Sequence, residues 1–151
     1  MHPKIKIKRV IFLLTTLIIL TSCSIPRLEI SQIYFQADVC FGECPIFNMT
    51  IDSDGGANYT AKMFNKLQGE FKTIIKKSQL DSLTMLIERA GVFSLNNKYS
   101  TNWTDHPTYT LTVKLKNGKV KTIKDYGPSG PEKLKLVYRQ IFSLRESQDW
   151  K

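Results

Sequence analysis

Apolar and polar residues alternate along several short segments of the chain, which is the period of a half-buried β-strand. The clearest case runs over residues 108–115, where Leu111, Val113 and Leu115 fall on one face. Further strands are expected over residues 31–39, 46–52, 58–63, 71–75 and 119–126. Asn117-Gly118 is a strong hairpin signal and predicts a two-residue turn between the last two strands.

Two other segments carry apolar residues at the period of a helix. The first is expected to begin at Ser78, an N-cap residue with Asp81 three positions later, and to end at Gly91. The second is expected to begin at Pro131. The positions predicted to be buried are Leu80, Leu83, Ile87 and Ala90 on the first helix, and Leu134, Val137, Tyr138, Ile141 and Leu144 on the second. This order of elements predicts a single α+β domain, an antiparallel sheet built from hairpins with two helices packed on one face.

The first 23 residues follow a different pattern. Four basic residues precede an apolar run from Val10 to Leu20. A helix of this length rises about 17 Å, which is too short for a bilayer core of about 30 Å. The run, and the sequence LTSC that ends at Cys23, resemble a bacterial lipoprotein signal peptide with its lipobox.

That resemblance implies how the chain is processed and where it is located. Residues 1–22 would be the signal peptide, and Cys23 would carry the lipid. Residues 23–28 would form a lipidated tether, and residues 29–151 the single domain. We therefore expect a membrane partner, held through acyl chains such as palmitate, at the periplasmic or surface face of the cell envelope.

Removal of the signal also changes the charge of the chain. The full sequence has 22 basic and 13 acidic side chains, a formal charge of +9. Four of the basic residues lie in the signal, so the mature chain keeps 18 and a formal charge of +5. A modest excess of this kind is ordinary for a soluble domain, and we expect no nucleic-acid partner.

The two remaining cysteines, Cys40 and Cys44, are four residues apart. In an oxidising envelope such a pair is expected to form a disulfide. The spacing, with Pro45 following and His106 far along the chain, also resembles the copper site of the Sco family of copper-delivery proteins. Cys40, Cys44 and His106 are therefore an alternative metal site, although the expected set of cofactors is none.

Four blocks of sequence carry a family resemblance. They are Cys40-Phe-Gly-x-Cys-Pro, Asp52-Ser-Asp-Gly, Thr104-Asp105-x-Pro107-Thr108 and Asp125-Tyr126-Gly127. With their spacing, these blocks resemble domain-of-unknown-function family 6438 over about residues 29–145. The resemblance implies a secreted or lipid-anchored bacterial protein, and it implies no activity.

The longest polar stretch, residues 96–106, contains Trp103, Asp105 and His106. Long loops often carry binding function. Trp103 is expected either to stack on a sugar or peptide or to bury against the end of the sheet. Asp105 is expected to bond backbone N–H groups of the loop, and adjacent residues of an extended chain point apart, so no Asp–His relay is predicted with His106.

Four lysines, Lys114, Lys116, Lys119 and Lys121, complete the candidate binding residues. The two-residue turn would place all of them on one face of the last hairpin. That face is either solvated or bound to an anionic partner such as lipid phosphate or an acidic glycan. The chain has no motif that supports catalysis, so we expect a non-enzyme that binds or scaffolds an envelope protein, a glycan or anionic lipid. The sequence does not predict the oligomeric state.

Overall fold

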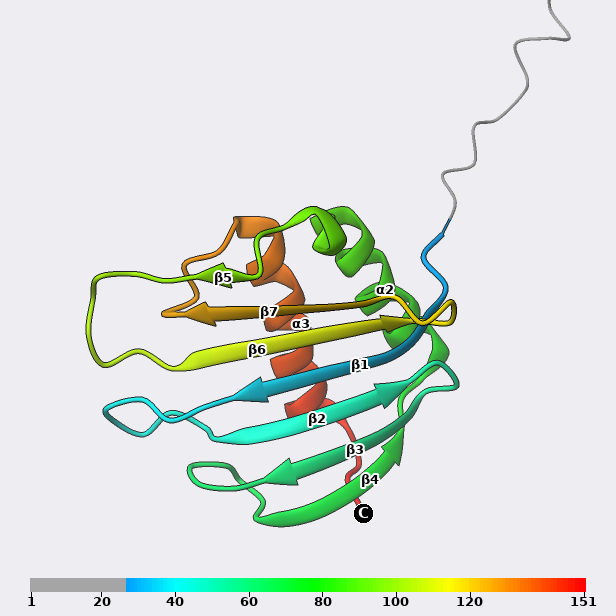
Figure 1. Ribbon diagram of the computed structural model, residues 1–151. Coiled ribbons are helices and arrows are strands. Elements are labelled where there is room, and N and C mark those ends of the chain that lie inside the picture. Colours follow the sequence, from blue (N-terminus) through cyan, green and yellow to red (C-terminus); the bar gives the residue numbers. More distant parts are fainter. Residues whose placement is uncertain (1–26) are drawn as a thin grey trace, which may run out of the picture.

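The computed structural model describes residues 27–151 (Figure 1). The expected signal peptide (residues 1–22), Cys23 and most of the expected tether (residues 23–28) lie outside the described residues. The described elements are β1 (Ile30–Ala37), β2 (Phe47–Asp52), β3 (Gly56–Ala61), β4 (Gly69–Ile74), α2 (Lys77–Ala90), η1 (Val92–Ser94), β5 (Lys98–Tyr99), β6 (Thr108–Leu115), β7 (Val120–Tyr126) and α3 (Glu132–Ser147).

These strands form one sheet in the order β4-β3-β2-β1-β6-β7-β5. Every neighbouring pair is antiparallel except β5 and β7, which run parallel. Both helices lie on the same face of the sheet (Figure 1). The predicted α+β class is therefore confirmed, while the short parallel strand β5 was not predicted.

The core fills the space between the sheet and the two helices. Its centre includes Phe35 of β1, Met49 of β2 and Leu111 of β6, all at most 1% exposed. The five positions predicted for α3 are buried as expected. Alternation along the strands thus removes one apolar face from water, which contributes about 25 cal/mol for each Å² buried.

The start of α2 differs from the prediction. The helix begins at Lys77, its N-cap residue is Lys76, and no side chain caps it. Lys77 pairs instead with Asp81 at 2.7 Å, one helical turn away. Ser78 is therefore not the N-cap residue, because the helix starts one residue earlier and brings Asp81 to Lys77. The end of α2 is as predicted, since Gly91 adopts a left-handed conformation with φ 62°.

The last hairpin has a different register from the predicted one. Lys114 faces Val120, and Val113 faces Lys121. The Leu115 N–H donates to the Lys119 carbonyl, so the turn contains three residues rather than two. A two-residue type I′ turn needs positive φ at both central residues, but within this turn only Gly118 has it.

This register separates the four lysines. Lys114 lies on the outer face of the sheet and Lys116 in the turn, whereas Lys121 lies on the helix-covered face opposite Val113. The prediction of one four-lysine face is therefore wrong. The same shift places Ile123 in the core, which the two-residue turn could not do without an additional bulge near Thr122.

Strand directions give the sheet two different ends (Figure 1). We call the end with residues 27–29, 53–55 and 116–119 the basal end. We call the end with residues 38–46, 62–68 and 100–107 the loop end. The described chain begins at the basal end, and β1 carries it across to the loop end.

The outer edge of β4 is covered in part by the last described residue. Lys72 N–H donates to the Lys151 carbonyl at 2.8 Å, and Lys151 N–H returns a bond to Lys72 at 3.0 Å. Trp150 packs beside Tyr59 with ring centroids 4.9 Å apart. The final residues therefore lie along the sheet edge.

Candidate functional site

Exposed apolar side chains concentrate at the loop end. Within residues 27–151 ten large apolar side chains are exposed, and six of them lie on the three loops of this end. These six are Val39, Phe41, Met63, Phe64, Leu67 and Trp103. Phe41 is 87% exposed and Trp103 75% exposed. The alternative that Trp103 buries against the end of the sheet is therefore wrong, and its stacking on a sugar or peptide stays a prediction.

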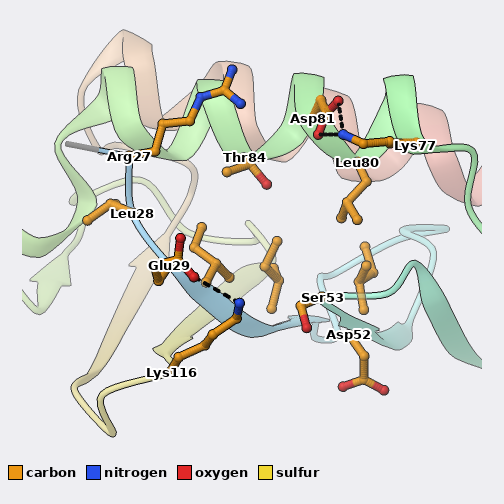
Figure 2. Close-up of a pocket in the computed structure, with 13 residues that line it drawn as sticks. Arg27, Leu28, Glu29, Asp52, Ser53, Lys77, Leu80, Asp81, Thr84 and Lys116 are labelled. Atoms are coloured by element: carbon orange, nitrogen blue, oxygen red, sulfur yellow. Dashed lines mark hydrogen bonds and ion pairs between the residues drawn. The ribbon is translucent and has the colours of Figure 1, made fainter. Parts of the chain in front are cut away.

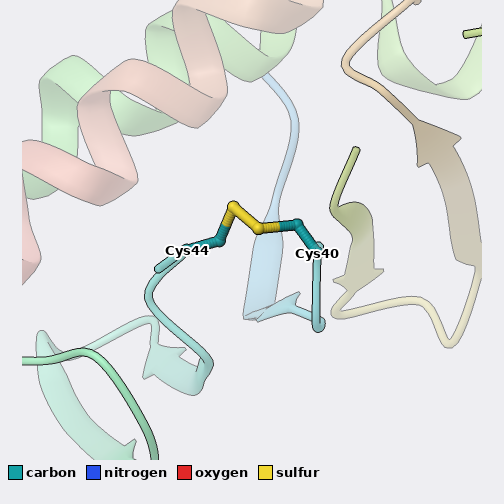
Figure 3. Close-up of a disulfide and its surroundings, with 2 residues drawn as sticks. All are labelled: Cys40 and Cys44. Carbon is teal, nitrogen blue, oxygen red and sulfur yellow. A yellow bond between two sulfur atoms is a disulfide. The ribbon is translucent and has the colours of Figure 1, made fainter. Parts of the chain in front are cut away.

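A disulfide closes the first of these loops (Figure 3). Cys40 and Cys44 are bonded, with their Cα atoms 5.9 Å apart, which confirms the predicted pairing. Phe41 lies within the closed loop, between the two cysteines. In the bonded form neither sulfur is a thiolate, the form that binds copper. Among residues 27–151 no three His, Cys, Asp or Glu side chains converge as metal ligands.

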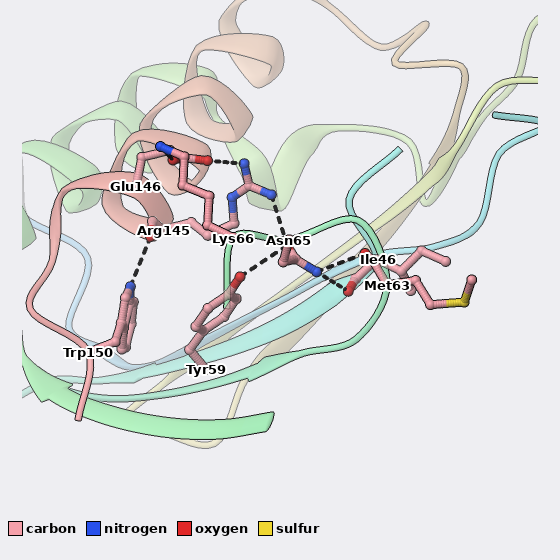
Figure 4. Close-up of polar contacts among 8 residues, drawn as sticks. All are labelled: Ile46, Tyr59, Met63, Asn65, Lys66, Arg145, Glu146 and Trp150. Carbon is pink, nitrogen blue, oxygen red and sulfur yellow. Dashed lines mark hydrogen bonds and ion pairs between the residues drawn. The ribbon is translucent and has the colours of Figure 1, made fainter. Parts of the chain in front are cut away.

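The second loop is held by a polar network around Asn65 (Figure 4). The side-chain oxygen of Asn65 accepts hydrogen bonds from the Tyr59 hydroxyl at 3.0 Å and from the Arg145 guanidinium at 2.9 Å. Its amide nitrogen donates to the Ile46 and Met63 carbonyls at 2.8 and 2.9 Å. One side chain thus fixes the loop to strand β3, to the segment before β2 and to helix α3.

Other contacts support this network. Lys66 pairs with Glu146 at 2.8 Å, and the hydrogen bond from Lys66 lowers the pKa of the Glu146 carboxyl. The Arg145 guanidinium also lies 5.2 Å from the ring centroid of Phe47. Met63 and Phe64 are therefore presented on a fixed loop, Phe64 with a positive φ of 58°. Nothing in the strand and helix patterns predicted Asn65 as an anchor.

The third loop carries the predicted Trp103, Asp105 and His106, all exposed. Asp105 has a left-handed φ of 71° and accepts a bond from the Thr104 hydroxyl at 3.2 Å. The expected bonds from backbone N–H groups to Asp105 are not among its contacts in the described residues. The His106 ring instead packs edge-on against Tyr126, with centroids 6.5 Å apart.

Glycine at position 127 allows this third loop to approach the sheet closely. A Cβ on Gly127 would lie 2.5 Å from the Thr101 methyl carbon and 3.2 Å from His106 Cβ, and the residue has a φ of 66°. Its N–H donates to the Pro107 carbonyl at 3.0 Å. The close approach fixes both ends of the segment that presents Trp103.

Asp125, in the last of the four sequence blocks, carries a buried carboxyl group. It is 0% exposed and accepts bonds from Ser129 N–H at 2.7 Å and Gly130 N–H at 3.1 Å. A Cβ on Gly130 would lie 2.8 Å from Asp125 Oδ2. Burial, and secondarily the Asp125 charge, raise the pKa of Tyr138 well above its ordinary value. Asp125 therefore holds the segment that leads into α3.

The lysines of the last hairpin lie at or near the basal end, and Figure 2 shows Lys116 there beside Glu29. Lys116 pairs with Glu29 at 2.8 Å, and its hydrogen bond and charge lower the pKa of that carboxyl. Lys121 Nζ donates to the Leu95 carbonyl and, at 2.6 Å, to Asn97 Oδ1. The Lys119 ammonium lies 5.1 Å from the ring centroid of Phe93. Each of these three lysines thus has a different environment, and Lys114 stands apart on the outer face.

The family model described as "Domain of unknown function (DUF6438)" matches residues 31–145. A search of curated proteins finds no match to the chain. Across residues 27–151 no helix has both the length and the apolar character needed to cross a membrane.

Proposed function

The chain belongs to the DUF6438 family, and from that premise we propose a bacterial cell-envelope lipoprotein whose domain binds a partner without catalysing a reaction. Lipid on Cys23 tethers the domain, and the loop end makes the contact. The partner is an envelope protein or glycan that meets an apolar and aromatic surface.

One observation carries this proposal, the gathering of exposed apolar side chains on three loops. Single exposed apolar residues are normal on any surface, but a concentrated group marks an interaction site. Phe41 and Trp103 are of the aromatic type that is enriched in protein interfaces. The disulfide, the Asn65 network and Gly127 support one loop each, so little conformational entropy is lost on binding.

The position of the loop end supports the same proposal. The basal end receives the chain from Cys23, and β1 separates the two ends by eight residues. At about 3.4 Å per residue, the loop end stands about 25 Å farther from the tether. A surface placed there is accessible to partners that a membrane-facing surface would not reach.

Site-specific photo-crosslinking tests the binding role. A benzophenone amino acid at Phe41 or Trp103 in the full-length protein should give a discrete crosslinked species in intact cells. Val120 is the matched control, since it is also an exposed apolar residue but lies at the start of β7. The same product from Val120, or none from the loop positions, would contradict the proposal.

Metabolic labelling tests the anchor separately. An alkynyl palmitate analogue should label the wild-type protein, and Cys23→Ala should abolish the label and release the protein from membranes. Cys40→Ala is the control, because Cys40 is bonded to Cys44 and should take no lipid. Persistent labelling of Cys23→Ala would rule out this cysteine as the acylation site.

A further inference from the structure

An apolar hollow of about 540 Å³ lies beside the point where the described chain begins. Its walls include the apolar side chains of Leu28, Met85, Val92 and Phe93. The volume falls in the range of small-molecule sites, about 300–1,000 Å³. It therefore has room for part of a lipid molecule.

Local structure explains why the hollow is apolar. The left-handed Gly91 ends α2 and turns the chain into η1, which places Val92 in the core and leaves Phe93 half-buried at the surface. On the opposite side the Leu28 N–H donates to Glu88 Oε1 at 2.7 Å. That bond ties the incoming chain to α2 and occupies one oxygen of Glu88, the only carboxylate among the described residues that line the hollow.

Two cations line the hollow, and a third lies against one of its apolar walls. Arg27 lies in the incoming chain and Arg89 in the last turn of α2, and both line the hollow. Lys119 reaches from the β6–β7 turn and stands over the ring of Phe93. Within residues 27–151 none of the three has a carboxylate in ion-pair distance. Apolar walls with a cationic rim fit an anionic amphiphile.

The place of the hollow in the chain decides which amphiphile. Cys23 precedes Arg27 by four residues, so a fully extended segment separates the two by at most about 14 Å. A chain tethered through Cys23 therefore holds this hollow at the membrane surface. This step rests on the proposed lipid anchor.

We propose that the hollow binds an anionic phospholipid of the anchoring membrane. Part of an acyl chain lies along Met85 and Phe93, and the phosphate lies near Arg27, Arg89 and Lys119. The lipid orients the domain with its basal end on the membrane and its loop end away from it. The interaction is weakened by salt, because exposed charges are screened over about 8–10 Å.

The experiment uses residues 24–151, which lack the acylated cysteine. This chain retains the whole sheet, both helices and the core, all of which lie within residues 27–151. Short-chain dihexanoyl phosphatidylglycerol, below its micelle concentration, is titrated while backbone amide signals are followed by NMR. Dihexanoyl phosphatidylcholine and inorganic phosphate are titrated in parallel.

Phosphatidylglycerol should shift the signals of Leu28, Gly91 and Phe93 and bind about tenfold more tightly than phosphatidylcholine. Inorganic phosphate alone should not reproduce the shifts. Absence of shifts at the hollow, equal affinity for the two lipids, or the same shifts with phosphate would each overturn the proposal.

Matched variants locate the site. Met85→Glu should weaken both lipids at least about tenfold, whereas Leu136→Glu should not, since Leu136 is similarly exposed on α3 but outside the hollow. Lys119→Gln should reduce the preference for phosphatidylglycerol, and Lys114→Gln, on the outer face of the same hairpin, should leave it. Equal effects of the two lysine variants would overturn the assignment of the rim.

Thermal unfolding confirms that each variant folds. If Met85→Glu does not fold, the comparison of Lys119→Gln with Lys114→Gln still tests the site. Because the chain used here has no anchor, its result is independent of the labelling of Cys23. Lipid binding without acylation would leave the hollow as a lipid site and remove the anchor. Acylation of Cys23 without lipid binding would keep the anchor and overturn the proposal that the hollow is a lipid site.

Discussion

The two ends of the sheet are built in different ways. At the loop end, exposed apolar side chains stand on loops held by a disulfide, by Asn65 and by the close approach at Gly127. At the basal end, turns are short, charges are paired or surround a hollow, and the hairpin turn is held by a few local bonds. Long loops on this fold need dedicated supports, whereas short turns are fixed by their own backbone geometry.

The sharpest test of this difference removes one asparagine from each end. Asn65→Ala removes four hydrogen bonds, those with the Tyr59 hydroxyl, Arg145 and two backbone carbonyls, so the free energy of unfolding should fall by about 3 kcal/mol. Asn117→Ala loses one bond, from Lys119 N–H, and should cost about 0.5 kcal/mol. Urea unfolding followed by circular dichroism measures both. Equal losses would remove the contrast between the ends.

The disulfide gives the next largest effect. Cys40→Ser with Cys44→Ser opens a loop of sequence separation 4, and closure of a loop that small contributes about 2 kcal/mol. The oxidised and reduced wild-type proteins should differ by the same amount in urea unfolding, and the double variant should not respond to reductant. A reductant response in the double variant would show that some other bond is involved.

A smaller effect tests the register of the last hairpin. Lys121→Met leaves the Leu95 carbonyl and Asn97 without their donor and should cost about 1 kcal/mol. Lys114→Met, on the outer face, should change stability by less than about 0.5 kcal/mol. With a two-residue turn the two lysines would lie on the same face of the sheet. Similar losses of stability in the two variants would therefore contradict the three-residue turn.

The smallest expected effect is a shift in the pKa of one carboxylate at each end of the sheet. Lys116 lowers the pKa of Glu29 and Lys66 lowers that of Glu146, each below the ordinary value of 4.5. Because the folded pKa values are lowered, each pair stabilises the fold above pH 4.5, and the contribution is lost as the pH falls through the folded pKa.

Carbon-detected NMR titration of the carboxyl groups measures both values. Lys116→Met should return the Glu29 pKa toward 4.5 and leave that of Glu146 unchanged. Lys66→Met should return the Glu146 pKa toward 4.5 and leave that of Glu29 unchanged. A change in both values with either variant would mean that the two ends are electrostatically coupled.

Features with a local cause could be predicted from the sequence. The alternation along β6, the buried face of α3, the left-handed Gly91 and the Cys40–Cys44 pairing each depend on residues close together in the chain. The hairpin register could not be predicted in this way. Asn117-Gly118 fits both a two-residue turn and a three-residue turn in which only Gly118 is left-handed.

The candidate site was predicted only in part. Trp103 was singled out as an aromatic residue in a long polar loop. Phe41 was not predicted, although its place between two cysteines is a signal that could have identified it. The disulfide was predicted, but contacts between residues far apart in the sequence could not be found in this way. Asn65 meets Arg145 from 80 residues away, and Lys119 meets Phe93 across two elements. Such pairs have no periodic signal, because they arise only when distant segments pack together.

The edges of the sheet bear on how the protein behaves at high concentration. A free edge strand presents unpaired backbone groups that can recruit another chain and begin an aggregate. Here the edge strand β4 is engaged at Lys72 by Lys151, and the opposite edge is β5, only two residues long. The Lys72–Lys151 pair and the shortness of β5 limit the backbone that could template a further strand, so we expect the domain to resist edge-to-edge association at high concentration.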